Sequence, residues 1–574
     1  MKKILLILQL FFATALFAQK WETVFEKTAG KETVTYENCI RYYKALDAAF
    51  PTIKIKEFGL TDAGYPLHLV LFSTDGKHDP IQWHKENKVV IMINNGIHPG
   101  EPDGIDASMM LLRDLVTGKI KAPSNVVLGI IPVYNIGGSL NRNRFSRVNQ
   151  EGPVSYGFRG NAQNLDLNRD FIKSDSRNAK EFAKIFHFLN PDILVDNHVS
   201  DGADYQHTMT LLTSQHSKLG TVMGEYLHDV FEPSLYKGMQ EKNWPLVPYV
   251  SFEGGNPERN WVGFYDAPRY SSGYATLFQT MAFMPETHML KPFEQRVKST
   301  YALMQTFIEE TTKQAAAIKE TRKKAIESVR NQQEFPLTYR VDTSKHDMVK
   351  FLGYESGQKI SDVTGMKRTY YDRTKPYSKE IKYFNYFKGE QWVKKPKAYL
   401  IPQGWHEVIG LLEINKVNMQ RLKADTVIEV EVSKLGEFRT STRVFEKHYR
   451  QSGMKFNTHT EKIQFLKGDY LIFTGQAADR FLIETLEPGA DDSYFSWNFF
   501  DAILQQKEGY SNYRWEDVAA AYLAANPALR TELENKKKAD EKFAANANAQ
   551  LDFVYKQSPY YEPAHMRYPV FKLR

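Results

Sequence analysis

The sequence predicts an α/β protein that is followed by a smaller β-rich domain and a helical segment. Up to about residue 333, apolar β-branched runs alternate with segments of helical spacing, a pattern typical of an open sheet covered by helices. Beyond Phe335, polar and apolar residues alternate, which indicates strands with one face in solvent. From Ser496 onward the spacing becomes helical again.

The elements of the first part can be assigned in chain order. Strands are expected where apolar residues run together, at 89–93, 125–133, 191–196 and 280–285. Helices are expected at 106–115, from a cap at Ser174 or Asp175 as far as 189, and as a long charged helix or pair of helices over 291–333. In open sheets of this kind, binding sites form at the carboxyl ends of the strands.

The rest of the chain is expected to fold separately. Strands are predicted at 399–402 and 426–432, and helices at 515–525 and 527–550. A length of 574 residues suggests two to four domains. We expect an α/β domain at 19–335, a β-rich accessory domain at 336–495 and a helical extension at 496–574.

Residues 1–18 have the layout of a secretory signal peptide. Lys2 and Lys3 precede an apolar run over 4–17, and small residues lead to a cleavage site after Ala18. The run is too short for a comfortable transmembrane helix. We therefore expect an exported protein, periplasmic or secreted. No other segment has 18 consecutive apolar residues, so no membrane contact is expected after cleavage.

Charge and cysteine content exclude several classes of function. A formal net charge of +7 over 574 residues, without a zinc finger or a basic helix, argues against nucleic acid as a partner. Cys39 is the single cysteine, so the chain has neither an intrachain disulfide nor a cysteine-based metal site. Any metal must therefore be held by histidine, aspartate or glutamate.

Two segments carry candidate metal ligands. His98 and Glu101 follow the expected strand at 89–93 in a loop shaped by Asn-Gly and Pro-Gly turns, and His198 follows the strand at 191–196. Two histidines and one glutamate leave a fourth position for water, as catalytic zinc requires. The alternatives are a surface histidine beside Glu101 at a helix start, and a structural role for His198 at the end of its strand.

Two further segments carry candidates for catalysis and substrate binding. Glu286 ends the strand at 280–285 and could act as a general base, although it could also cap the next helix while His288 is the functional group. Residues 135–171 hold five arginines, a side chain that binds carboxylates through a bidentate fork: Arg142, Arg144, Arg147, Arg159 and Arg169. At least two of these are expected to be simply solvated or paired.

In this order, the segments resemble the zinc metallocarboxypeptidases of the carboxypeptidase A type. The resemblance covers about residues 88–290 and rests on HPGE (98–101), LDLNRDF (165–171), DNH (196–198), PRYSSGY (268–274) and PETHML (285–290). It implies a mixed, mainly parallel eight-stranded sheet flanked by helices. It also implies one Zn²⁺ ion held by His98, Glu101 and His198, with Glu286 as the catalytic base.

The resemblance extends to substrate binding. It implies that Asn168 and Arg169 bind the terminal carboxylate of the substrate and that Arg147, with Arg144 as the alternative, polarises the scissile carbonyl. Tyr270 is the candidate for the tyrosine that closes over the substrate, and Tyr265 and Tyr274 are the alternatives. The chain departs from the family pattern at 135–138, which reads NIGG in place of NPDG, and at Asp170, which replaces an asparagine. A negative charge there is expected to weaken the Arg169 clamp.

These observations predict an exported zinc metallocarboxypeptidase that hydrolyses the C-terminal bond of peptides with a free carboxylate. The alternatives are a zinc amidase or deacylase acting on N-acyl amino acids or murein peptides, and a catalytically silent protein that binds peptides or glycans. Beyond residue 335, a group of aromatic residues could form a sugar platform or belong to the core: Trp392, Trp405, Tyr494, Phe495 and Trp497.

Overall fold

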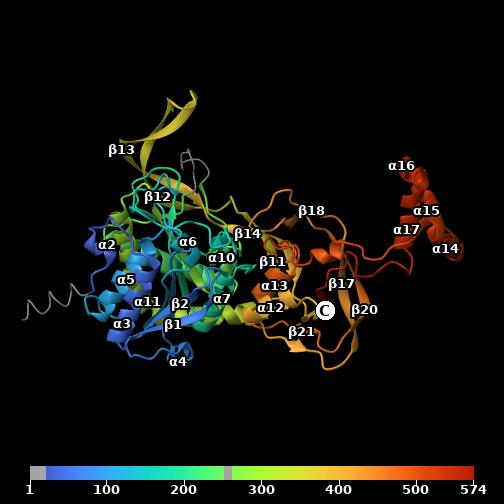
Figure 1. The fold of residues 1–574 in the computed structure, drawn as a ribbon, viewed down its shortest axis with the longest axis horizontal. Helices are drawn as coiled ribbons and strands as arrows, with labels where there is room; N and C mark the ends of the chain where they lie inside the picture. The colour runs from blue at the N-terminus through green and yellow to red at the C-terminus, as the bar shows by residue number, and fades with distance from the viewer. Residues whose placement is uncertain (1–20, 251–260) are drawn as a thin grey trace, which may run out of the picture.

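The computed structural model describes residues 21–250 and 261–574, so the predicted signal peptide lies outside the described residues. Its main sheet has eight strands in a continuous order, β1-β2-β4-β3-β5-β10-β7-β8, and a short ninth strand, β6, that pairs with β10 (Figure 1). The strands are β1 (Ile53–Leu60), β2 (Pro66–Phe72), β3 (Val89–Asn94), β4 (Val126–Ile131), β5 (Ile193–Asp196), β6 (His198–Ser200), β7 (Met209–Thr213), β8 (Val247–Pro248) and β10 (Met281–His288).

The sheet is mixed and mainly parallel, as the resemblance implies. β3 runs parallel to both β4 and β5, and β10 runs parallel to β5 and then to β6. Antiparallel pairs join β1 to β2, β2 to β4 and β7 to β10. The carboxyl ends of β3 and β5, and the second half of β10, therefore meet at one edge of the sheet.

Helices cover both faces of this sheet. Val89, Ile91 and Ile93 of β3 pack with α3 (Tyr36–Ala49), α5 (Asp103–Val116) and the 39-residue helix α11 (Phe293–Asn331). Val90 and Met92 point the opposite way and pack with α7 (Arg177–Leu189) and α10 (Ser271–Thr276). Burial on both faces explains why β3 reads as a continuous apolar run.

The N-cap of α7 lies one or two residues beyond the predicted positions, Ser174 or Asp175. Ser176 is the N-cap, and its side chain accepts a hydrogen bond from the Ala179 amide. Ser174 has a φ of 46° and the Asp175 carboxylate is bound by Lys173, so neither is placed to cap the helix. The end of the helix at Leu189 is as predicted, because Asn190 takes a left-handed conformation there.

Two antiparallel strand pairs follow α11, one of them inserted between the strands of the other. β11 (Glu334–Val341) pairs with β14 (Phe387–Lys394), and between them β12 (Asp347–Ile360) pairs with β13 (Lys367–Phe384). The end of β13 also pairs with β9 (Trp261–Val262). In sequence, β9 comes just before β10 of the main sheet. The β12–β13 hairpin is thus attached to the α/β part and extends away from it (Figure 1).

A second sheet of six strands forms most of the remaining structure. Its order is β16 (Gln420–Arg421), β21 (Tyr470–Phe473), β15 (Ala398–Ile401), β22 (Phe571–Leu573), β17 (Thr426–Leu435) and β20 (Phe456–Phe465). Helices α12 (His406–Ile414) and α13 (Asp479–Leu486) pack against it. The chain's last strand lies inside this sheet, so the segment expected to be helical from Ser496 returns to β-structure at its end.

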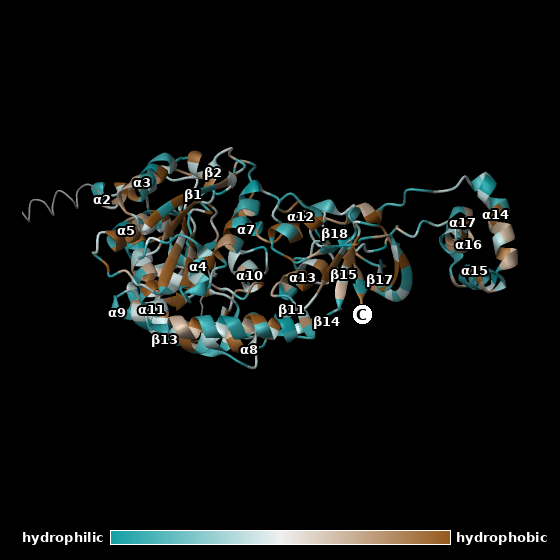
Figure 2. Ribbon diagram, turned by 90° about the horizontal axis from the view of Figure 1, so that it is seen from below, coloured by the Kyte–Doolittle hydropathy of each residue, from teal (hydrophilic) through white to brown (hydrophobic). Residues whose placement is uncertain are grey.

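Four helices near the C-terminus project from the body of the molecule (Figures 1 and 2). They are α14 (Asn512–Ala525), α15 (Pro527–Ala539), α16 (Glu541–Ala544) and α17 (Ala547–Lys556). The single helix predicted at 527–550 was wrong, because the side chains of Asp540 and Asn546 cap new helices within it. Among the described residues, no helix has both the length and the apolar content of a membrane span.

Candidate active site

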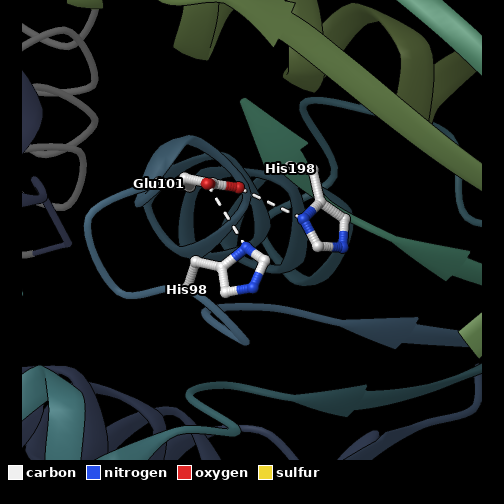
Figure 3. A group of neighbouring side chains, drawn as sticks. All are labelled: His98, Glu101 and His198. Carbon is white, nitrogen blue, oxygen red and sulfur yellow. Dashed lines mark hydrogen bonds and ion pairs between the residues drawn. The ribbon is translucent and has the colours of Figure 1, made fainter. Parts of the chain in front are cut away.

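Three buried side chains converge at the edge of the main sheet. His98 and Glu101 lie in the loop between β3 and α5, and His198 begins β6. One ligand atom from each of the three lies within 4.8 Å of the others. Figure 3 shows the Glu101 carboxylate facing both imidazole rings. Two nitrogens and one oxygen at this spacing are a donor set suited to a zinc ion.

Each imidazole ring has a contact on either side, and together these contacts orient both rings toward the proposed metal position. The Nδ1 atoms of His98 and His198 lie 3.3 Å and 3.1 Å from the Glu101 carboxylate. Each ring's Nε2 contacts a carboxylate on the other side, at 2.9 Å from Asp166 for His98 and 3.1 Å from Asp196 for His198. Such outer carboxylates fix the tautomer and raise the basicity of metal-binding histidines. Apart from its 3.3 Å ion pair with Glu101, the buried His98 Nδ1 has no hydrogen-bond partner in the described part of the chain, so it is available to a metal.

A pocket of about 160 Å³ opens onto these three side chains. Its polar lining includes Glu286, Arg159, Asn168 and Arg169, and apolar residues such as Leu212 and Met284 complete it. A small concave site with a few convergent charged groups is the usual form of an enzyme's active site.

The pairing of β6 with β10 brings Glu286 to the pocket. Glu286 is opposite His198 in the parallel register, so its carboxylate enters the same pocket as the three candidate ligands. Burial raises the pKa of Glu286 to about 7, with the charge of Glu101 adding to the effect and His198 opposing it. A carboxylate with a pKa near neutrality is suited to accept and return a proton.

Comparison with known proteins places this arrangement in a family. The family model described as zinc carboxypeptidase matches residues 39–357, more than half of the chain. The chain belongs to the zinc carboxypeptidase family. Its cofactor is therefore zinc and its reaction is peptide hydrolysis.

Individual relatives are distant. Carboxypeptidase 2 of Trichophyton equinum is 21% identical over 440 residues, covering 73% of this chain and 75% of the relative. Carboxypeptidase 2 of Trichophyton rubrum is 21% identical over 433 residues, covering 71% and 74%. Among solved structures, carboxypeptidase A of Helicoverpa armigera matches with a TM-score of 0.37 at 15% identity, covering 49% of this chain and 74% of that one. A metallo-carboxypeptidase from Burkholderia cenocepacia matches with a TM-score of 0.35 at 16% identity, covering 47% and 67%.

Asn168 and Arg169 of this zinc carboxypeptidase family member both line the pocket. They lie on the short 3-10 turn η1 (Leu167–Arg169), and the Arg169 guanidinium stacks 4.7 Å from the Tyr270 ring centroid. The neighbouring Asp170 carboxylate is buried and accepts hydrogen bonds from Lys173 Nζ at 2.7 Å and Ser176 Oγ at 2.5 Å. Lys173 Nζ also bonds to the Asp175 carboxylate at 2.6 Å, so one lysine is shared by two carboxylates and the expected weakening of the Arg169 clamp stays a prediction.

Two arginines of the loop that was expected to polarise the scissile carbonyl reach the proposed ligand Glu101. Arg147 Nη1 donates to Glu101 Oε1 at 2.9 Å, and Arg144 is exposed on the loop; neither lines the pocket. Arg159 does line it, with Nη1 3.6 Å from Glu101 Oε1 and Nε donating to Asp166 at 3.0 Å. Arg159 was among the five arginines that the sequence singled out. Its position in the chain, nearer to Asn168 than Arg147 is, was the signal that could have favoured it as a pocket residue.

The tyrosine candidates separate clearly. Tyr270 lines the pocket, whereas Tyr265 stacks on other aromatic rings and Tyr274 is buried with its hydroxyl donating to Asn415 Oδ1. Tyr249, which directly follows β8, also lines the pocket and was missed because no sequence motif marks it.

The alternative role of His288 is a structural one. Its buried ring contacts the Ala203 carbonyl at 2.8 Å through Nε2 and accepts the Leu290 amide through Nδ1. Burial lowers the pKa of His288 to about 4, so the ring is neutral at ordinary pH. Both ring nitrogens are occupied, and His288 does not line the pocket.

Proposed function

We propose that this chain is an exported zinc carboxypeptidase that removes the C-terminal residue from peptides with a free carboxylate. The observation that carries the proposal is one small pocket lined by a metal-binding triad, a carboxylate base and two arginines. His98, Glu101 and His198 would hold the ion. The family match supports peptide hydrolysis, and the arginines support the preference for a terminal carboxylate.

Each remaining group has a role that follows from its chemistry. The zinc ion, when bound, supplies Lewis-acid activation of water and of the scissile carbonyl. Glu286 takes the proton from the attacking water and passes it to the leaving amine. Arg159 donates hydrogen bonds to the oxygen that gains negative charge in the transition state. Asn168 and Arg169 hold the substrate carboxylate, which converts binding energy into orientation of the scissile bond.

The proposal includes location and domain organisation. The basic and apolar segments of residues 1–18 support export, and periplasmic or secreted location both fit that signal. Residues 19–335 would form the catalytic domain, because all the pocket residues fall within it. Residues 336–495 and 496–574 would be accessory segments.

Paired peptides test the proposed specificity. The chain from Gln19 onward, loaded with zinc, is incubated with peptides of one sequence that have either a free or an amidated C-terminus, and the products are identified by mass spectrometry. We expect stepwise loss of C-terminal residues from the free peptides alone. The Glu286→Gln variant is the control for a contaminating peptidase and is expected to leave both peptides intact.

Two outcomes would contradict this proposal. Equal cleavage of the amidated peptides would show that a terminal carboxylate is not recognised, and would favour an amidase or an endopeptidase. Stable peptides together with hydrolysis of N-acyl amino acids would favour the deacylase alternative.

A further inference from the structure

A second pocket lies where the β11–β14 strand pair meets the helices of the α/β part. Its volume is about 510 Å³, within the range of roughly 300–1,000 Å³ that is usual for small-molecule sites. Ser217 and Thr221 of α8 (His216–Tyr226) line one side, and the end of α11 lines another. Ser217 Oγ also accepts a hydrogen bond from the Phe387 amide at 3.2 Å, which ties α8 to β14.

Trp392 provides a flat ring at this pocket. Its indole lies against Gly389, where a Cβ would meet the ring at 2.7 Å, and Pro336 is its partner across the strand pair. One face of the ring is therefore supported by the β11–β14 strand pair, while 55% of the residue is exposed. Of the five aromatic residues that the sequence suggested for a sugar platform, Tyr494, Phe495 and Trp497 are instead buried in the core.

Unused polar groups surround this ring. Thr221, Ser328 and Asn331 line the pocket as exposed residues, and their side chains form no hydrogen bonds with the described residues. Arg480 is 5% exposed, and its hydrogen bonds to described residues, with Tyr339 and Glu484, both use Nη1. Its Nε and Nη2 donors thus remain for a ligand. A ligand that fits has a flat apolar face and several hydroxyl groups, and an acidic group on it would accept hydrogen bonds from the Arg480 nitrogens that Glu484 does not use.

From this arrangement we propose that the junction pocket binds a saccharide ring carrying an acidic group. The C–H face of the sugar stacks on the exposed face of Trp392, since aromatic faces attract polarised C–H groups. Its hydroxyl groups bond to the unused side chains, and its carboxylate meets Arg480. Proline-rich peptides also dock in aromatic grooves, but they offer few partners for this number of hydroxyl and amide groups.

The pocket is connected to the candidate active site through consecutive residues. Phe264 lines the zinc pocket, and the ring of Tyr265 packs 5.6 Å from both Tyr339 and Phe387, which line the junction pocket. Binding of the saccharide does not depend on peptide hydrolysis, so the inference can be tested independently of the proposed function.

Saturation-transfer NMR on the zinc-loaded chain from Gln19 tests the site with a matched pair of probes. These are methyl β-glucopyranosiduronate and methyl β-glucopyranoside, which differ only in the carboxylate. We expect transfer to the ring protons of both probes, stronger for the acid. In the Trp392→Ala variant transfer to both is lost, and in Trp392→Phe it is retained. Tyr513→Ala removes an aromatic residue that is 90% exposed on α14 and should change nothing.

Other results would overturn the inference. Absence of transfer to either probe, or transfer unchanged in Trp392→Ala, would show that this ring does not bind sugars. Transfer to a tetraproline peptide that depends on Trp392, without transfer to the sugars, would assign the pocket to a peptide instead. If the Arg480→Gln variant folds, as judged by its circular dichroism, it should lose the preference for the acid; an unchanged preference would remove the acidic group from the proposal.

Discussion

His198 Nε2 lies 3.1 Å from Asp196 Oδ2, while Nδ1 of the same ring lies 3.1 Å from the Glu101 carboxylate. Asp196 is itself held by the Asn94 amide at 2.9 Å and the Ser271 hydroxyl at 2.6 Å. A buried carboxylate with three such contacts fixes the imidazole plane. The end of β5 thus determines how His198 faces the proposed metal.

The Asp196→Asn variant should lower zinc affinity by about 10–100-fold, the usual effect of removing an outer carboxylate. The amide keeps the volume but no longer attracts the proton on Nε2, so the ring is a weaker ligand. Competition with a fluorescent chelator would measure the affinity. Asp362→Asn, on the exposed tip of the β12–β13 hairpin, is the matched control, and an equal loss there would point to a nonspecific effect.

Glu286→Gln should lower kcat by about 10²–10⁴-fold, the usual contribution of a positioned acid–base group. Zinc content and substrate KM should change little, because Glu286 is not one of the three proposed ligands. Steady-state kinetics with a free-carboxylate peptide, together with metal analysis, would separate these effects. A variant with normal turnover would assign the proton transfer to another group.

Arg159→Gln and Arg147→Gln should have different effects. Loss of Arg159 removes a donor to the transition-state oxygen and should cost about 10²–10³-fold in kcat. Loss of Arg147 leaves Glu101 without its 2.9 Å partner and should mainly change zinc affinity. Kinetics at saturating zinc would distinguish them. If Arg147→Gln had the larger loss of kcat under those conditions, the sequence-based assignment of Arg147 would be favoured over Arg159.

The His228–Asp347 pair should make the anchoring of the β12–β13 hairpin depend on pH. The two side chains are 2.8 Å apart; hydrogen bonding to Asp347 raises the pKa of His228 from 6.5 to about 9, against the opposing effect of burial. Although burial opposes the change, the hydrogen bond from His228 lowers the pKa of Asp347 from 3.8 to about 2. The stabilisation from His228 is present in full below pH 6.5 and is lost as pH rises through 9. The contribution of Asp347 is present above pH 3.8 and is lost as pH falls through 2.

His228→Gln should therefore destabilise the protein at pH 6 and have little effect at pH 10. Because the pair is partly exposed, solvent screening limits the difference to about 1 kcal/mol. Thermal unfolding midpoints of the variant and the wild type at both pH values would measure it. Equal destabilisation at the two pH values would attribute the effect to packing and not to charge.

Much of the fold was predictable because the main sheet is buried on both faces. β3, β5 and β10 read as apolar runs, and the structure brings ionisable residues in or just after each of them to one edge. The break at Asp540 was less visible, because the same charged, alanine-rich pattern continues through 527–550. The return of β22 to the second sheet could not be read from three residues, since their pairing depends on strands more than 100 positions away.

By itself, the sequence determined the metal-binding triad and the carboxylate that faces it. His198 and Glu286 come within two residues of a predicted strand, and His98 lies in the loop after one; parallel strands place such residues at a common edge. Only the tertiary structure decided which arginine and which tyrosines enter the pocket. Arg147 and Arg159 lie on one irregular loop, without the periodicity that relates sequence position to direction. Their placement depends on contacts with Glu101 and Asp166, which form only when distant segments pack together.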